Sequence, residues 1–368
     1  MTICVNIKSK KYLLHLSIKC KYLKIWFDIL TPKQFLFFEP FIKKLERNHT
    51  LLCTSRNYKQ VKDITNFGTT NLLFLGKHGG SEKFGKLAAS LDRSKLLAKK
   101  INEFKPDLTI SFCSPEASRV SFGLGVKHIA FNDSPYASAV MKLSLPFVDK
   151  LLIPWIYPKN DFQNYGIDKK NIIQYKAIDA AIIIKREITL KDSQDRKSKK
   201  TILIRPEETE ASYVSKQSNV VSIIEKIIHD FPNSNKLVLT RYRNQSNSLK
   251  NKFSENVQII SKVVDGKKLL LSSDVFVGSG GTMTAESALL GVPTISYNAV
   301  PNGIENYLVT KNIVVRCMTP NSITKNIKKI FSYSKKSEFI RKKRIEKFVK
   351  SLDDPYPILL KAIKSIIK

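Results

Sequence analysis

The chain has 368 residues, of which 42% are hydrophobic and 10% aromatic, and its formal net charge is +32. This length and apolar content exclude a disordered chain and favour two folded domains. The five cysteines are odd in number, scattered and without a CxxC motif, so neither a zinc site nor a disulfide framework is predicted. A reducing compartment, the cytoplasm, is the expected setting.

The positive charge has three competing explanations. It could attract an anionic membrane surface or lipid phosphate, it could bind nucleic acid, or it could reflect a lysine-rich composition that leaves a solvated basic surface. No nucleic-acid module is visible, so no nucleic acid is expected as a partner. We favour the compositional explanation and place peripheral contact with the inner membrane face second. No stretch reaches the roughly 18 apolar residues that a membrane span needs.

Strands and helices alternate along the first half of the chain. Short apolar runs flanked by turn residues predict strands, and apolar residues three or four apart predict helices. The predicted strands cover residues 24–29, 50–55, 71–75, 108–112, 128–132 and 150–153, and the predicted helices cover 35–46, 59–67, 84–104, 117–124 and 137–145. We assign residues 1–22 to an N-terminal extension and residues 23–184 to a first domain.

Residues 185–200 are almost wholly polar and charged, which is typical of a linker. Beyond them the alternation restarts, with strands predicted at 201–204, 236–240, 257–260, 275–277 and 294–297, and helices at 215–230, 267–272, 283–290 and from 322 onward. We assign residues 201–334 to a second domain. Residues 335–368 are predicted to form basic C-terminal helices, broken near Asp354, that pack back on the first domain.

This pattern predicts an α/β fold of two Rossmann-like domains with a ligand cleft between them. Strands separated by helices of this length form parallel sheets with right-handed crossovers. Ligands of such sheets bind at the carboxyl ends of the strands, and the boundary between domains is a common ligand site.

Residues 275–295 contain the most informative stretch. A short strand leads into Ser279-Gly280-Gly281-Thr282, a loop with little side-chain bulk, and then into a helix that carries Glu286 in its second turn. Backbone N–H groups and the positive end of the helix dipole meet at such a loop, which suits a phosphate or diphosphate. Glu286 would suit ribose hydroxyls. The alternative is a tight turn followed by a solvated glutamate.

The order Ser279-Gly280-Gly281, then Glu286, then Gly291 and Pro293, resembles the nucleotide-sugar site of GT-B glycosyltransferases. Its spacing is most similar to that of the N-acetylglucosaminyltransferase that makes the peptidoglycan lipid precursor. UDP-N-acetylglucosamine 2-epimerases share a related pattern with a shorter interval. The resemblance implies that Ser279, Gly280 and Gly281, with Thr282 beside them, contact a diphosphate and that Glu286 binds the ribose.

The wider chain, about residues 23–351, resembles a mostly archaeal family of unassigned function in the same superfamily. The likeness rests on six segments, KIWFDILTPKQ (24–34), GKHGG (76–80), SPEASRVSFGLG (114–125), AFNDS (130–134), IRPEE (204–208) and GSGGTMTAE (278–286). It implies the fold more strongly than the reaction, because one fold supports many activities.

Two further residues are candidates for donor binding. Arg205 directly follows a strand of the second half and could hold two phosphate oxygens at once. Its alternative role is a surface ion pair with Glu207 or Glu208. The segment around Val264 follows the strand at 257–260 and could frame the base edge with backbone groups, as the matching loop does in related transferases.

Four residues of the first domain are candidates for acid–base chemistry. Asp28 ends the first strand and is expected to point toward the cleft, and Glu116 and Asp133 follow two later strands. The order of Glu116 and Asp133 resembles that of two carboxylates in the 2-epimerases, and such a pair could act as acid and base. Each could equally cap a helix or a turn. His78 lies in a glycine-flanked loop and could be a base or an ordinary loop residue.

The leading hypothesis is a GT-B glycosyltransferase that moves a sugar, expected to be an N-acetylhexosamine, from a UDP-sugar to an acceptor glycan or lipid-linked saccharide. No metal site and no cofactor besides the UDP-sugar substrate are expected. The first alternative is a 2-epimerase-like enzyme, but the His-Arg pair of that family appears here as Ile204-Arg205. The glycine-rich acceptor loop of the peptidoglycan enzyme is also replaced, by residues 30–34. The second alternative is a non-catalytic protein that binds a nucleotide or an anionic lipid.

Overall fold

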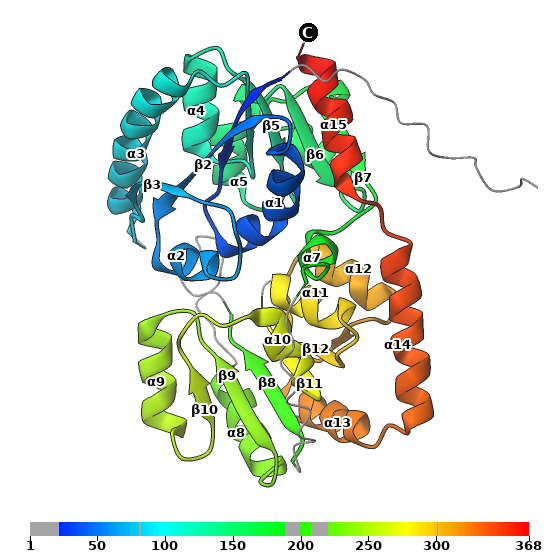
Figure 1. Ribbon diagram of the computed structural model, residues 1–368. Helices are drawn as coiled ribbons and strands as arrows, with labels where there is room; N and C mark the ends of the chain where they lie inside the picture. Colours follow the sequence, from blue (N-terminus) through cyan, green and yellow to red (C-terminus); the bar gives the residue numbers. More distant parts are fainter. Residues whose placement is uncertain (1–21, 81, 188–198, 208–219, 300, 368) are drawn as a thin grey trace, which may run out of the picture.

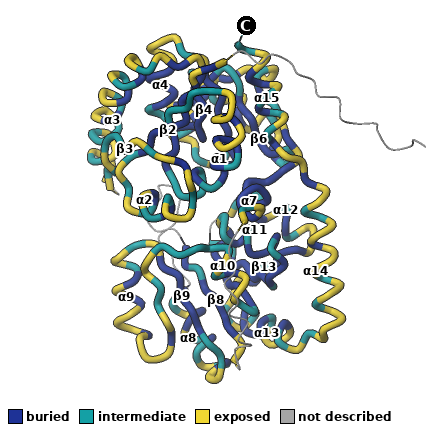
Figure 2. Tube along the Cα trace, viewed as in Figure 1, coloured by how far each residue is buried: buried dark blue, intermediate teal, exposed yellow. Residues whose placement is uncertain are grey.

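The computed structural model describes residues 22–80, 82–187, 199–207, 220–299 and 301–367 (Figure 1). The predicted extension, apart from Tyr22, and residues 188–198 of the predicted linker lie outside the described residues. The described chain forms two α/β halves, one above the other in Figure 1, each with a buried sheet surrounded by helices whose outer sides are exposed (Figure 2).

The first half contains a sheet of seven strands. They are β1 (Lys24–Asp28), β2 (Thr50–Asn57), β3 (Leu73–Lys77), β4 (Leu108–Ser111), β5 (Lys127–Phe131), β6 (Lys150–Pro154) and β7 (Ile172–Tyr175). The helices are α1 (Pro32–Leu45), α2 (Lys59–Thr65), α3 (Lys83–Phe104), α4 (Pro115–Gly123), α5 (Ser138–Ser144), α6 (Asn160–Gln163) and α7 (Asp179–Ile183), with two 3-10 turns, η1 (Leu145–Phe147) and η2 (Lys169–Asn171). All pairings are parallel, in the order β3-β2-β1-β4-β5-β6-β7.

The second half repeats this design with six strands. They are β8 (Thr201–Arg205), β9 (Asn235–Leu239), β10 (Gln258–Ile260), β11 (Val275–Gly278), β12 (Thr294–Ser296) and β13 (Val315–Arg316). The helices are α8 (Val220–Asp230), α9 (Arg243–Phe253), α10 (Gly266–Leu271), α11 (Thr282–Leu289), α12 (Gly303–Thr310), α13 (Pro320–Phe331), α14 (Lys335–Lys350) and α15 (Pro355–Ile366). The parallel order is β10-β9-β8-β11-β12-β13. This arrangement confirms the predicted pair of Rossmann-like halves.

Helices cover both faces of each sheet because successive strand residues point to opposite sides. In β1, Phe27 packs into the cluster formed with α1 and α15, whereas Trp26 packs with α3 and α4 on the other face. In the second sheet, Ile204 packs with α8, α9 and α13, whereas Leu203 packs with α10 on the opposite face. Strands buried on both sides therefore appear in the sequence as nearly continuous apolar runs.

The two halves share one hydrophobic core. Side chains of α1, α7 and α15 pack together with Ala285, Ala288 and Leu289 of α11 in a single buried cluster. The short helix α7 lies against both α1 of the first half and α11 of the second. Two direct contacts also cross the boundary. The Gln60 side chain donates a hydrogen bond to the Arg241 carbonyl at 2.9 Å. The rings of Trp155 and Tyr307 pack edge to face, with their centroids 5.3 Å apart.

The C-terminal helices span both halves. Arg341 of α14 donates a hydrogen bond to the Gly291 carbonyl in the second half at 2.6 Å. The chain then crosses back, and α15 places Leu359 and Ile363 in the core of the first half (Figure 1). Lys44 of α1 forms an ion pair with Asp354, which caps α15. Among the described residues, no helix combines the length and apolar content needed to cross a bilayer.

Most predicted elements are present with ends shifted by a few residues, but six helices and strands were missed. They are β7, α6, α7, α9, α12 and β13. The helix predicted at 215–230 begins, within the described residues, at Val220. Five of the missed elements have eight residues or fewer, so they are too short to show a clear apolar period. The sixth, α9, buries only Ser246, Leu249 and Phe253 in a polar sequence.

Candidate functional site

The glycine-rich loop lies at the point where the strand order of the second sheet reverses. Strand β11 pairs with β8, and Gly278 is the register partner of Arg205. Both strands end at the same carboxyl edge, so Arg205 and the loop 279–281 are neighbours although 73 positions separate Arg205 from Gly278 in the sequence. The crevice at such a reversal is where doubly wound sheets bind ligands.

Gly278, Gly280 and Gly281 lie in different surroundings. A Cβ at Gly278 would lie 2.4 Å from the Phe276 ring and 2.6 Å from the Thr284 hydroxyl, so a side chain has no room. Gly280 has φ of +100°, a backbone conformation that L-residues rarely adopt. Gly281 has φ of −77°, and a Cβ there would meet no atom within 4 Å. Neither strain nor packing therefore requires glycine at position 281, and the space above it is open.

Helix α11 begins at this open position. Gly281 is its N-cap and supplies no side-chain cap, so the helix start keeps backbone N–H groups that have no intrahelical partner. Neighbouring side chains fix the loop itself. The Gly280 N–H donates to the Thr284 hydroxyl at 3.2 Å, and Asn302 donates to the Gly280 carbonyl at 2.7 Å. The result is a firmly held helix N-terminus of the kind that binds anions.

The Arg205 guanidinium lies across the ends of two strands. Its Nη1 donates to the carbonyls of Leu239 and Thr240 at 2.7 and 3.0 Å, at the end of β9. Glu207, one of the two proposed ion-pair partners, accepts a hydrogen bond from the Tyr297 hydroxyl at 2.6 Å instead. Glu208 lies outside the described residues. Arg205 is therefore positioned by backbone carbonyls at the same edge as the glycine loop.

Glu286 projects from α11 toward the boundary between the two halves. Burial, together with nearby Asp265, raises the pKa of Glu286 to about 7, although the charges of Arg186, Lys33 and Arg205 favour its ionised form. Lys33 belongs to the first half and Arg205 to the second, so the electrostatics of Glu286 depend on both. A half-buried carboxyl among three cations suits hydrogen-bond donors from a ligand.

The predicted base-edge segment adjoins this region. Val264 is half-buried and packs on the cluster that contains Phe276 and Leu270. The next residue, Asp265, caps α10 and forms an ion pair with Arg186 at 2.6 Å. Arg186 follows α7, so this ion pair fastens the end of the first half to the loop after β10.

The expected orientation of Asp28 requires a correction. Asp28 ends β1, but it is fully buried and forms a two-point ion pair with Arg93, with distances of 2.5 and 3.1 Å. Thr54 and Ser114 also donate to its carboxylate. Burial opposes ionisation, but the charge and hydrogen bonds of Arg93 hold the pKa of Asp28 below its usual value. Strand direction alone placed Asp28 at the correct edge but could not show that Arg93 covers it.

Glu116 belongs to the same network. It lies in the first turn of α4, where its Oε2 is 3.6 Å from the Arg93 guanidinium and accepts from Ser114 at 3.3 Å. Its side chain is 12% exposed, so unlike Asp28 it reaches the surface. Ser114, rather than Glu116, caps α4.

Asp133 lies in a second network, separate from that of Glu116. Lys33, in the first turn of α1, lies 2.5 Å from Asp133 and 2.7 Å from Asp179 at the start of α7. The two carboxyl groups also lie within hydrogen-bonding reach of each other. Ser134 donates to Asp133 at 2.9 Å, and Tyr175 donates to Asp179 at 3.3 Å. The predicted pair Glu116 and Asp133 is thus divided between two networks, and the partner of Asp133 is Asp179.

The two aspartates of this network differ in proton affinity. Burial opposes ionisation of Asp133, but the charge and hydrogen bond of Lys33 lower its pKa below the usual value. Burial and the charge of Asp133 raise the pKa of Asp179 to about 7. One lysine thus faces two carboxyls that share a proton near neutral pH. Groups with separated pKa values are the usual components of acid–base chemistry.

His78 lies in the loop that follows β3. Its ring stacks on the Tyr58 ring, with the two centroids 4.8 Å apart, and its Nδ1 accepts a hydrogen bond from the Gly80 N–H at 3.1 Å. The Arg56 guanidinium lies 5.7 Å from the same Tyr58 ring. His78 therefore has a defined position at the carboxyl edge of the first sheet, beside α2.

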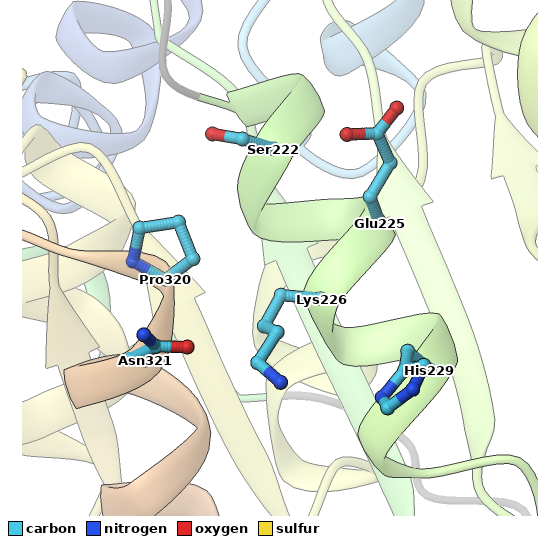
Figure 3. Close-up of a pocket in the computed structure, with 6 residues that line it drawn as sticks. All are labelled: Ser222, Glu225, Lys226, His229, Pro320 and Asn321. Atoms are coloured by element: carbon cyan, nitrogen blue, oxygen red, sulfur yellow. The ribbon is translucent and has the colours of Figure 1, made fainter.

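A surface pocket of about 470 Å³ lies elsewhere, between α8 and the start of α13 (Figure 3). It is lined by Ser222, Glu225, Lys226, His229, Pro320 and Asn321. Its charged groups already have partners, because Lys226 pairs with Asp230 and Glu225 with Lys252. The pocket lies outside one face of the second sheet and not at the carboxyl edge of its strands.

Sequence reasoning missed Arg93, Lys33 and Asp179. A signal for Arg93 was present, because Arg93, Leu97 and Ile101 recur at four-residue intervals and form the buried face of α3. Lys33 and Asp179 gave no comparable signal, since each begins a helix at a strand end far from the other in sequence. Within the described ranges, no group of three or more His, Cys, Asp or Glu side chains is arranged to hold a metal.

Comparison with known proteins shows the family of this chain. The model of the family described as "Protein of unknown function (DUF354)" matches residues 23–368. "Uncharacterized protein MJ0665" of Methanocaldococcus jannaschii is 29% identical over 362 residues, which cover 94% of this chain and 99% of that protein. The family resemblance predicted from the sequence is thereby confirmed.

Solved structures share the fold at low identity. The UDP-GlcNAc 2-epimerase of Neisseria meningitidis, bound to UDP-GlcNAc, superposes with a TM-score of 0.70 at 14% identity, covering 93% of this chain and 100% of that one. The spinosyn forosaminyltransferase SpnP gives a TM-score of 0.61 at 14% identity, covering 94% and 100%. These neighbours are enzymes of the GT-B and 2-epimerase type, and at such identities they establish the fold alone.

Proposed function

The chain belongs to the DUF354 family, and from its site we propose that it is a GT-B glycosyltransferase using a UDP-sugar, with an N-acetylhexosamine as the transferred group. The observation that supports this most directly is that an anion-binding loop and a buried carboxylate network face each other at the boundary between the two halves. The glycine loop and Glu286 of α11 approach it from the second half, and the Lys33, Asp133 and Asp179 network approaches it from the first.

In this proposal the second half binds the donor. The diphosphate lies at the N-terminus of α11, above Gly281, and Arg205 offsets the charge that builds on the leaving UDP. Glu286 accepts hydrogen bonds from the ribose hydroxyls, and backbone groups around Val264 frame the base. The helix dipole and Arg205 carry out charge neutralisation with the chain's own groups, so no cofactor besides the substrate is invoked.

The first half supplies the base. The acceptor hydroxyl gives its proton to the Asp133–Asp179 pair and attacks the anomeric carbon, while the bond from that carbon to the UDP oxygen breaks. Asp133 is 7% exposed and Asp179 only 1%, so Asp133 contacts the acceptor. Asp179 supplies proton affinity near neutral pH and Lys33 holds the pair in place. Glu116, paired with Arg93, is a second polar group at the same edge and orients the acceptor.

A thermal-shift screen of nucleoside diphosphates and nucleotide sugars tests the donor. A ligand that binds the folded state raises the unfolding temperature by mass action, so UDP and UDP-N-acetylhexosamines should give the largest shifts. Equal shifts from all nucleotides, or none, would contradict the donor assignment.

A 2-epimerase-like reaction is the second candidate. The observation that favours it is the pair of aspartates with separated proton affinities, because inversion of a carbon centre requires one group to remove a proton and another to return it. Incubation with UDP-GlcNAc alone discriminates between the two reactions. An epimer or free UDP without added acceptor supports the epimerase, whereas unaltered donor supports the transferase.

The Asp133→Asn variant tests the base. It should reduce turnover by about 100-fold or more with donor binding retained, because a neutral amide does not take up the proton. Asp168→Asn, at an exposed position of the same half, is the matched control and should keep full turnover. Full turnover of Asp133→Asn would contradict the assignment of Asp133 as the base.

A further inference from the structure

One helix of the first half exposes a row of apolar side chains. On α3, Phe84 is 81% exposed, Leu87 59% and Leu91 63%. Their spacing of three and four residues places them on one side of the helix, opposite the face that buries Arg93 and Leu97. Figure 2 shows this outer side of α3 exposed along most of its length. Soluble proteins rarely leave so many large apolar groups in line without an interaction partner.

Lysines surround this row. Lys83, Lys95 and Lys99 of α3 are all exposed, and Lys77 lies exposed at the end of the adjacent edge strand β3. Within α3 the exposed acidic side chains are Asp92 and Glu103, and Glu103 already pairs with Lys100. An apolar row between cations is the pattern of helices that lie in the interface of an anionic bilayer.

We propose that the outer face of α3 is a docking surface for an anionic lipid bilayer. Phe84, Leu87 and Leu91 enter the boundary between headgroups and acyl chains, and the flanking lysines meet the anionic headgroups. A second copy of this chain is a poorer occupant. A symmetric contact would bring Lys83, Lys95 and Lys99 of one copy against the same lysines of the other, and the chain's net charge of +32 opposes self-association.

The position of α3 connects this surface to the site. The first turn of α3 packs on the loop that carries His78, so closely that a Cβ on Gly79 would lie 2.6 Å from the Lys86 Cα. Further along the helix, Arg93 holds Asp28 and Glu116 at the carboxyl edge of the sheet. A bilayer on α3 thus lies beside the edge where the acceptor binds. On the proposed function, this geometry selects a lipid-linked saccharide as the acceptor.

Vesicle flotation tests the surface independently of any reaction. The wild-type chain should float with vesicles of phosphatidylcholine and phosphatidylglycerol in equal parts and not with phosphatidylcholine alone, and salt should weaken the binding. Phe84→Ser/Leu87→Ser/Leu91→Ser should weaken binding by about tenfold or more, because the buried apolar area is lost. Lys83→Glu/Lys95→Glu should weaken it as well.

Helix α14 supplies the matched control. It is also basic and exposes Phe339 at 61% and Ile340 at 57%, but these two are adjacent and do not form a row. Phe339→Ser/Ile340→Ser should leave vesicle binding unchanged. Circular dichroism and UDP binding verify that each variant is folded and that donor binding is intact, so failure of the surface and failure of the proposed function remain distinct.

Three results would overturn the proposal. They are no binding of the wild-type chain to the mixed vesicles, unchanged binding of the α3 triple variant, and loss of binding in the α14 variant instead. Sedimentation velocity tests whether a second copy of the chain binds this surface instead. If the triple variant converts a dimer to a monomer and vesicle binding is unaffected, the face is a contact between two copies.

Discussion

The two sheets share a strand order, yet the carboxyl edges at their reversal points are built differently. In the second half, a glycine loop, a helix N-terminus and Arg205 leave open space above Gly281. In the first half, the corresponding point between β1 and β4 is filled by Asp28 and Arg93, which are both buried. The same fold thus forms an open anion site in one half and a closed ion pair in the other, and the polar groups near the boundary lie beside that pair.

The largest loss of stability is expected when Arg93 is removed from the buried ion pair of the first half. Arg93→Met leaves Asp28 buried without its cation and should cost about 3–5 kcal/mol of unfolding free energy. Urea denaturation followed by circular dichroism measures this loss. Arg119→Met removes an exposed arginine of neighbouring α4 and should change stability little. A cost below about 1 kcal/mol for Arg93→Met would mean that the ion pair does not organise this edge.

The aspartate pair predicts a pH dependence with a definite sign. Folding raises the pKa of Asp179 to about 7, so the folded state binds its proton more tightly than the unfolded state. Stability should therefore fall as pH rises from about 4 through 7, and the full cost should remain above pH 7. Asp179→Asn should be more stable than the wild type by about 1–3 kcal/mol at pH 8, with the difference vanishing near pH 4.

Thermal unfolding across this pH range checks the sign. The exposed Asp168→Asn variant serves as the reference, because it removes one carboxylate without touching Lys33. If Asp179→Asn is less stable than the wild type at pH 8, Lys33 binds both carboxylates in their ionised forms and the shared proton is ruled out.

At the glycine loop of the second half, a substitution should change UDP affinity without changing stability. Gly281→Ala adds a methyl group to empty space at an ordinary φ, so the unfolding temperature should stay constant while UDP affinity falls about tenfold. Gly280→Ala should lower both, by about 1–2 kcal/mol for folding, because φ of +100° is strained for alanine. Gly123→Ala, also in open space but far along α4, should change neither.

The same contrast explains what the sequence could and could not predict. The glycine loop, Glu286 and Arg205 lie on consecutive or register-paired segments whose local pattern has a direct physical meaning. The first-half networks depend on long-range pairing, since Arg93 meets Asp28 across 65 positions and Lys33 meets Asp179 across 146. No periodicity encodes such contacts, so Asp28 and Asp133 were placed at the correct edge without their partners.

Long helices and buried strands were predicted from the sequence, whereas short elements were missed. The long amphipathic helix α3 and the buried strands β1, β4, β8 and β11 were predicted to within about two residues. Strand β7 was missed because its four residues follow a turn at Gly166 and alternate only weakly. Helix α7 was missed because five residues make little more than one turn, and yet this helix joins the two halves.

Calorimetric titration of UDP into the wild-type chain and the Glu286→Gln variant tests whether α11 carries the donor site. We expect UDP to bind the wild type and the variant to lose about tenfold in affinity, because a neutral amide accepts ribose hydrogen bonds less strongly than a carboxylate. Glu103→Gln, exposed on α3, should bind as the wild type does. Equal UDP affinity in Glu286→Gln, or no UDP binding by the wild type, would contradict the assignment of this site.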